Sequence, residues 1–239
     1  MTPWDLQETY RLVRAAFGGD QEILARESAR SVTDRQAFSS YHFAEAMRLS
    51  KRFERTHLAG ARTILELHVE GAEGSERAFQ VYMVKAGAHA LAAVQSLHAI
   101  PDIFAHAVYF AAGQNLKPYA LKDSRISLPS VVSCLKKDRG FCGLALPLQS
   151  IQEGEGWSHL AAVANMSKHR SVVRAAYNED WTGTRDNARE LQVSSFKRGG
   201  KEYPAVALRG LLEPEYDRIM KTVVCTGNEL NASLRAAAA

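Results

Sequence analysis

The chain has 239 residues, of which 46% are hydrophobic and 23% are charged. These fractions are ordinary for a globular protein and exclude disorder over most of the length. The formal net charge of +4 is mild, so charge alone gives little reason to expect a nucleic-acid ligand. No apolar run approaches the ~20 residues of a membrane span, and the chain does not open with a signal-peptide pattern. We therefore expect no contact with a membrane.

The three cysteines are Cys134, Cys142 and Cys225, an odd number without a paired CxxC spacing. This pattern disfavours both a metal finger and a disulfide framework. A reducing cytoplasm is the simplest setting for such a chain. We therefore expect a cytoplasmic protein.

The first third of the chain is predicted to be helical. Residues 4–17 follow an amphipathic pattern that ends at a pair of glycines. A second helix is predicted over residues 33–57, with Thr33 as its N-cap. Residues 61–69 are expected to continue as helix until two further glycines interrupt them.

The main feature is a long helix predicted from Ser75, a good N-cap, to Gly113, a good residue for the position after a helix. Pro101 lies inside this segment, so we expect a kink near residues 97–101. Apolar residues occur nearly all round the helix. A helix that is apolar on every side is usually central in its domain.

The second half of the chain mixes helices with one hairpin. A short helix is expected around residues 130–137, and a stronger one over 156–177, before a polar loop. Residues 190–208 read as a β-hairpin, with Pro204 marking an edge strand. Pro214 is expected at the first position of the last helix.

These elements predict a mainly α fold: a helical bundle around a long kinked central helix, with a small β-hairpin before the C-terminal helix. We expect a single helical domain over residues 1–235 and a disordered tail over 236–239. The expected parts of the domain are the N-terminal helices (1–74), the bundle core (75–177), the hairpin (190–208) and the C-terminal helix (213–235).

A polar stripe on the long helix is the first candidate site. Gln95, His98, Asp102 and His106 fall within one narrow sector of the helix. His98 and Asp102 are four residues apart, so their side chains can meet. A carboxylate beside a histidine orients the ring and favours its charged form, which general-base catalysis uses. The alternative is a solvated edge or a satisfied structural pair.

Asn165 and His169 form a second pair with the same spacing on the later helix. Their face also carries small and β-branched apolar residues, which predicts that both side chains point toward the core. An unsatisfied buried polar group costs about 1–3 kcal/mol, so such a pair needs a partner. The stripe with His98 and Asp102 is the candidate partner.

Metal and cofactor sites have weaker support. His98, Asp102, His106 and His169 could supply metal ligands, but the sequence holds no His-Glu-x-x-His. The glycine pairs lack phosphate-loop and dinucleotide signatures, and no Gly-x-Ser-x-Gly is present. We expect no metal and no cofactor.

The segments SLHAIPDIFAHAVYFAAGQN and ANMSKHRSVVRAAY resemble bacterial HEPN-like helical-bundle proteins. The hairpin FKRGGKEYP and the last helix look like the tail of some of those chains, so the resemblance covers about residues 80–235. It implies a helical bundle, often dimeric, in a superfamily that contains RNA-cleaving toxins, defence proteins and inactive binding modules.

The nuclease branch of that family carries an arginine, usually followed by a polar residue, with a histidine four to six positions beyond. Arg52 with His57 and Arg62 with His68 have this spacing, but neither arginine precedes the expected asparagine, aspartate or histidine. The number of matches is also what chance predicts. The spacing therefore gives no support for ribonuclease activity.

The leading prediction is a HEPN-like accessory or binding protein that contacts RNA, or a partner chain such as a second copy. In that interpretation Lys168 and Arg170 meet phosphate, while Asn165 and His169 organise the site. One alternative is a metal-independent ribonuclease of toxin or defence type, with His169 or His98 as general base and the RNA 2′-hydroxyl as nucleophile. Another is a purely structural or oligomerisation module.

Overall fold

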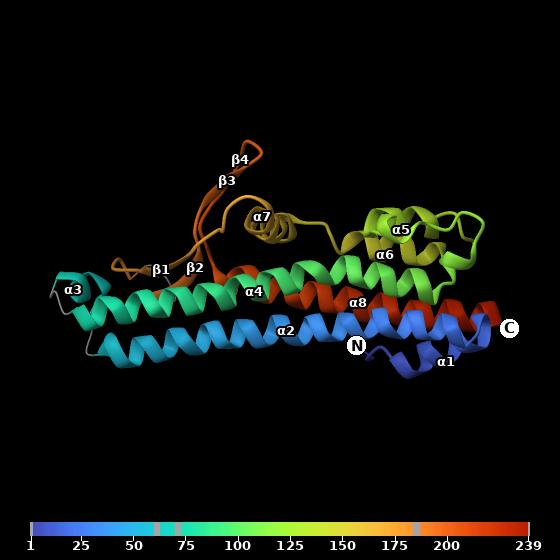
Figure 1. Cartoon of the computed structure of the whole chain (residues 1–239), viewed down its shortest axis with the longest axis horizontal. Coiled ribbons are helices and arrows are strands. Elements are labelled where there is room, and N and C mark those ends of the chain that lie inside the picture. The colour runs from blue at the N-terminus through green and yellow to red at the C-terminus, as the bar shows by residue number, and fades with distance from the viewer. Residues whose placement is uncertain (1, 60–62, 70–72, 184–186, 239) are drawn as a thin grey trace. The chain divides into compact units, whose positions relative to one another are not determined.

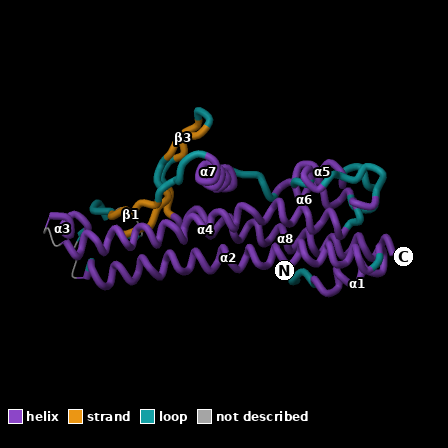
Figure 2. Tube along the Cα trace, viewed as in Figure 1, coloured by secondary structure: helices purple, strands orange, loops and turns teal. Residues whose placement is uncertain are grey.

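The computed structural model describes residues 2–59, 63–69, 73–183 and 187–238. Helix dominates these residues, and the strands are confined to the segment between the last two helices (Figures 1 and 2). This confirms the mainly α fold with a small antiparallel β region before the C-terminal helix. None of the helices in the described ranges is both long enough and apolar enough to cross a membrane.

The helices fall into long and short members. The long ones are α2 (Gly19–His57), α4 (Glu73–Ala111) and α8 (Leu208–Ala238). The short ones are α1 (Leu6–Phe17), α3 (Ile64–Val69), α5 (Leu128–Leu135), α6 (Ala145–Ser150) and α7 (Glu155–His169). Single 3₁₀ turns cover Gln114–Leu116, Asp123–Arg125 and Cys142–Leu144.

The chain packs as two compact units. Unit 1 comprises the described residues of 1–36, 99–157 and 215–239, and unit 2 those of 37–98 and 158–214. Helices α2, α4, α7 and α8 each contribute residues to both. The expectation of one domain over 1–235 stays a prediction.

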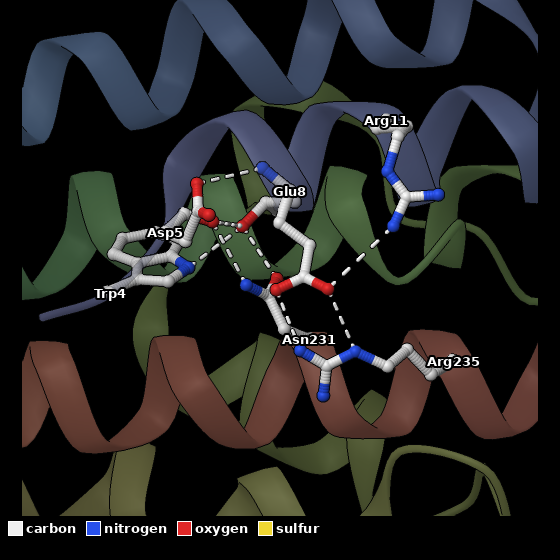
Figure 3. A network of polar contacts seen from close by, with 7 residues as sticks. Trp4, Asp5, Glu8, Arg11, Asn231 and Arg235 are labelled. Atoms are coloured by element: carbon white, nitrogen blue, oxygen red, sulfur yellow. Dashed lines mark hydrogen bonds and ion pairs between the residues drawn. The ribbon is translucent and has the colours of Figure 1, made fainter. Parts of the chain in front are cut away.

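In unit 1, polar contacts hold the N-terminal helix against α8 (Figure 3). Thr9 and Asn231 are both 2% exposed, and the Thr9 hydroxyl donates to Oδ1 of Asn231 at 2.6 Å. Nε1 of Trp4 donates to the same hydroxyl at 2.8 Å. At the rim, the guanidinium of Arg235 donates to Glu8 at 2.7 and 2.9 Å. Because buried polar groups are costly when unpaired, this set fixes how α1 lies on α8.

Among the described residues of unit 2, five strands form two small antiparallel sheets. Strand β2 (Arg189–Val193) lies between β1 (Ala175–Glu179) and β5 (Val206–Ala207). Strands β3 (Phe196–Arg198) and β4 (Lys201–Tyr203) form a hairpin. Its turn uses Gly199 and Gly200 at φ +58° and +79°, which is the left-handed backbone that a two-residue hairpin turn needs. The predicted hairpin is therefore confirmed.

An aromatic cluster packs β1 against the helices of unit 2. Phe53 of α2 stacks on Tyr82 of α4 with ring centroids 4.6 Å apart, and Tyr177 of β1 meets Tyr82 edge-on at 5.7 Å. The Tyr177 hydroxyl donates to Glu54 at 2.9 Å, and the hydroxyls of Ser50 and Tyr82 lie 2.9 Å apart. The cluster covers the face of β1 that points toward the helices. The hydroxyl groups of its tyrosines keep hydrogen-bond partners.

Several predicted helix boundaries are wrong. Helix α2 begins at Gly19, directly after Gly18 ends α1 with φ +94°, so Thr33 lies inside a helix and is no N-cap. Its hydroxyl donates to the carbonyl of Arg30 instead. Helix α4 begins at Glu73, which places Ser75 in its first turn. The predicted end is better placed, because Gly113 has φ +61° just after the helix.

Two further corrections concern α7 and α8. Helix α7 ends at His169, where a helix was predicted to residue 177, and residues 175–179 form β1. Helix α8 begins at Leu208, so Pro214 lies inside it, and it continues to Ala238 through most of the tail that was expected to be disordered. Residue 239 lies outside the described residues. Pro101 lies inside a continuous α4, and the kink there stays a prediction.

Candidate functional site

The polar stripe of α4 has structural partners in unit 1. Asp102 is exposed, and its Oδ1 accepts a hydrogen bond from the backbone N–H of Leu128 at 3.2 Å. Nε2 of His106 lies 3.1 Å from the carbonyl oxygen of Ile126 and acts as the donor there. Asp102 thus satisfies one of the first N–H groups of α5, which have no partner within the helix, and His106 holds the residue just before its N-cap. These contacts agree with the alternative interpretation, in which the polar groups of the stripe have structural hydrogen-bond partners.

His98 is half-buried and belongs to unit 2, whereas Asp102 belongs to unit 1. A direct contact between the two side chains stays a prediction. His98 lies on α4, whereas Asn165 and His169 lie on α7, and their meeting in one pocket stays a prediction.

The second predicted pair does not point toward the core as a unit. Asn165 is half-buried, but His169 is exposed, as are its neighbours Lys168 and Arg170. The reason is the early end of α7: the backbone N–H groups of Arg170 and Ser171 both donate to the carbonyl of Met166. The apolar residues that were expected to continue the helical face instead lead into β1. Phosphate contact by Lys168 and Arg170 stays a prediction, and their exposure permits it.

Other histidines, which the sequence did not single out, have the more unusual surroundings. The Nδ1 atoms of His42 and His89 lie 2.9 Å apart, and burial followed by the charge of His89 lowers the pKa of His42. His159 packs against the rings of Phe196 and Tyr203, and no described residue hydrogen-bonds to its buried Nε2. Within the described ranges, no three His, Cys, Asp or Glu side chains are grouped so that they could hold a metal ion.

Unit 2 contains an apolar groove between α4 and β1, which we call the α4–β1 groove. Its volume is about 710 Å³. Residues of one face of α4 line one wall, and β1 with the residues just before it lines the other. The lining residues are Phe79, Gln80, Met83, Val84, Gly87, Ala88, Leu91, Val172, Val173, Arg174, Ala175, Ala176 and Tyr177.

The groove leaves large apolar side chains in contact with water. Val84 is 72% exposed and Val172 is 61% exposed. Single exposed apolar side chains are ordinary, but a contiguous patch that lines a hollow is typical of an interaction site. Val84 also shows that α4 is not buried on every side, although its sequence is apolar all round.

Strand β1 comes close to α4 at Gly87, where there is room for an alanine but not for a larger side chain. A Cβ atom at this position would lie 3.4 Å from the Cβ of Ala175, so a larger side chain would push the strand away from the helix. The close approach brings the backbone of β1 to the rim of the groove.

No strand of the described residues pairs with the outer edge of β1. Within the part of the chain that the structure describes, β1 pairs with β2 alone. The N–H of Ser194 donates to the carbonyl of Arg174 at 2.9 Å, and the N–H of Asp180 donates to the carbonyl of Ala188 at 2.7 Å. Because hydrogen-bonding direction alternates along a strand, the even-numbered residues of β1 face β2.

The N–H and C=O groups of Ala175, Tyr177 and Glu179 therefore point away from β2. Such an unpaired edge is a template for a further strand.

The groove offers few polar side chains. None of its described lining residues is His, Cys, Asp or Glu, and Arg174 is the one charged residue among them. The hydroxyl of Tyr177 is held by Glu54, and burial raises the pKa of this phenol well above its usual range. A groove of this composition offers apolar contact, backbone hydrogen bonds and one cation.

The open edge could not be found from sequence, because helical spacing was assigned to residues that form a strand. The β-branched pair Val172-Val173 just before the strand is the available signal.

Comparison with known proteins finds no match to this chain. No family model matches the chain, no curated protein matches it, and no solved structure is similar to it. The HEPN-like resemblance therefore stays a prediction.

Proposed function

We propose that this protein is a binding module that accepts an extended polypeptide segment in the α4–β1 groove. The observation that carries the proposal is an apolar groove lined by β1, whose outer edge pairs with no strand among the described residues. A strand added beside β1 gains backbone hydrogen bonds from the edge, and its alternate side chains gain apolar contact. This proposal takes up the partner-binding branch of the HEPN-like prediction.

The energetics favour an apolar segment with an acidic residue. Fully burying a valine-sized side chain contributes about 1.5–3 kcal/mol, so covering Val84 and Val172 gives a driving force. Arg174 lines the groove and can pair with a carboxylate of the bound segment. Such a pair is partly solvated, so it sets orientation more than affinity.

Peptide binding tests the proposal. The probe is a fluorescein-labelled peptide of alternating valine and threonine with one glutamate, and binding is followed by fluorescence anisotropy. We expect saturable binding that Val84→Asp weakens at least ~10-fold, because a buried carboxylate is costly in an apolar groove.

Leu146→Asp is the matched control, because Leu146 is also 72% exposed but lies on α6 in unit 1. Equal losses for the two variants, or no binding by the unmodified protein at concentrations at which it is monomeric, would overturn the proposal. Circular dichroism of each variant shows whether the fold is kept.

A further inference from the structure

We propose that a second copy of this chain pairs its β1 with β1 of the first, antiparallel, about a twofold axis at Tyr177. The inference rests on the proposed function, because it names the strand that the open edge accepts. It is carried by the hydrogen-bond direction of β1 and by the charges at its two ends.

The direction of the backbone groups restricts the register. Only Ala175, Tyr177 and Glu179 offer N–H and C=O groups at the outer edge, so these residues must face each other across the axis. With the axis at Tyr177, Tyr177 faces its own copy and Ala175 faces Glu179. This register uses the whole of β1 and pairs all three outward residues on each strand.

The charges select the same register. With the axis at Tyr177, position 174 of one copy lies opposite position 180 of the other. The dimer therefore contains two equivalent pairs of Arg174 with the Asp180 of the other copy. The Asp180 carboxylate accepts hydrogen bonds from the backbone N–H and the hydroxyl of Thr182, at 2.9 and 2.5 Å, which fixes it at the end of β1. Opposite charges at directly opposed positions stabilise an antiparallel pair.

Neighbouring registers lose this match. Moving the axis by one residue toward the N-terminus places Arg174 opposite Asn178, and moving it by one toward the C-terminus places Arg174 opposite Thr182. Each shift also leaves an outward residue without a partner. A pairing about a twofold axis covers the outer edge of β1 in both copies. It therefore closes on itself and does not propagate into a filament.

The dimer also explains the exposed valines. Val84 and Val172 line the groove beside the β1 edge, and the second copy would cover that edge and shield them from water.

The test is the mass of the full chain in solution, measured by sedimentation equilibrium over a range of concentrations. The chain has a mass of 26.4 kDa, so the dimer has twice that mass. We expect a reversible dimer, with at least a ~10-fold higher dissociation constant for Arg174→Glu and for Asp180→Lys, because each variant places like charges opposite each other twice. The double variant Arg174→Glu/Asp180→Lys restores opposite charges and should return to within ~3-fold of the unmodified chain.

Arg170→Glu is the control, since Arg170 is an exposed cation just outside β1. A monomer at ~100 μM, single variants that dimerise as well as the unmodified chain, or a double variant as weak as the singles would each overturn the inference.

The two proposals fail separately. A monomer that still binds the valine–threonine peptide overturns the second-copy pairing and leaves the binding function in place. If Val84→Asp leaves dimerisation unchanged and the protein does not bind the peptide, the proposed binding function of the α4–β1 groove is overturned.

Discussion

Gly227 of α8 lies against the indole of Trp4. We expect Gly227→Ala to lower the free energy of unfolding when Trp4 is present and to raise it when Trp4 is replaced by alanine. A Cβ atom at position 227 would lie 2.6 Å from Cε2 of Trp4 and closer still to Cγ and Cδ2. These atoms lie near the root of the side chain, so the whole indole would have to move.

The magnitude follows from what Trp4 would lose. Its Nε1–H donates to Thr9 at 2.8 Å, a bond of net value about 1 kcal/mol. Its ring meets Phe104 edge-on at 5.7 Å, which contributes about 1 kcal/mol beyond burial. With strain and lost burial, the cost of overpacking is about 3 kcal/mol. Alanine recovers about 1 kcal/mol in helix propensity, so Gly227→Ala should destabilise by about 2 kcal/mol.

Urea unfolding followed by circular dichroism measures the change. In the Trp4→Ala background the clash is absent, so Gly227→Ala should instead stabilise by about 1 kcal/mol. Gly87→Ala is the control: its Cβ would make an ordinary contact at 3.4 Å, and it should stabilise by up to about 1 kcal/mol in both backgrounds. If Gly227→Ala stabilises the protein while Trp4 is present, the packing described for Trp4 is wrong.

Two pH dependences follow from buried side chains. Burial raises the pKa of Tyr82 to about 12. The unfolded chain therefore loses this proton first, and the free energy of unfolding falls as pH rises from about 10 toward 12. Tyr82→Phe should reduce that fall by on the order of 2 kcal/mol in urea titrations, and an unchanged slope would count against it. Burial, followed by the charge of Lys201, lowers the pKa of His159. The unfolded chain therefore binds this proton first, and stability falls as pH drops below about 6.5. His159→Phe should make the melting temperature less sensitive to acid, and equal sensitivity in both proteins would refute this.

The fold could be predicted where the local sequence decides the structure. The amphipathic pattern before Gly18 predicted α1, Gly113 predicted the end of α4, and the Gly199-Gly200 turn predicted the hairpin. In each case one glycine adopts a backbone that other residues avoid, so the signal does not depend on distant contacts.

Boundaries failed where packing overrides the local signal. Residues 175–177 have a pattern that fits a helix, but pairing with β2 and the contact of Tyr177 with Tyr82 make them part of a strand. Pro214 lies within α8 and not at its start. Sequence reasoning treats a proline as a boundary, although a helix can continue through one at a cost of about 3 kcal/mol that other contacts offset.

The site could not be predicted because it depends on contacts between distant segments. The polar stripe was visible as a pattern, and the structure assigns Asp102 and His106 to holding the start of α5. The α4–β1 groove consists of apolar residues that look like core in the sequence. Val84 is one of them, and the fold leaves it 72% exposed.

Amide hydrogen exchange of β1, followed by NMR, tests the central claim most directly. In the free monomer, the N–H groups of Ala175, Tyr177 and Glu179 should exchange quickly, while those of Ala176 and Asn178 are protected by pairing with β2. Adding the valine–threonine peptide, or raising the protein concentration, should slow exchange at the three odd-numbered residues. Unchanged exchange at these residues when the peptide is bound would contradict an added strand at the β1 edge.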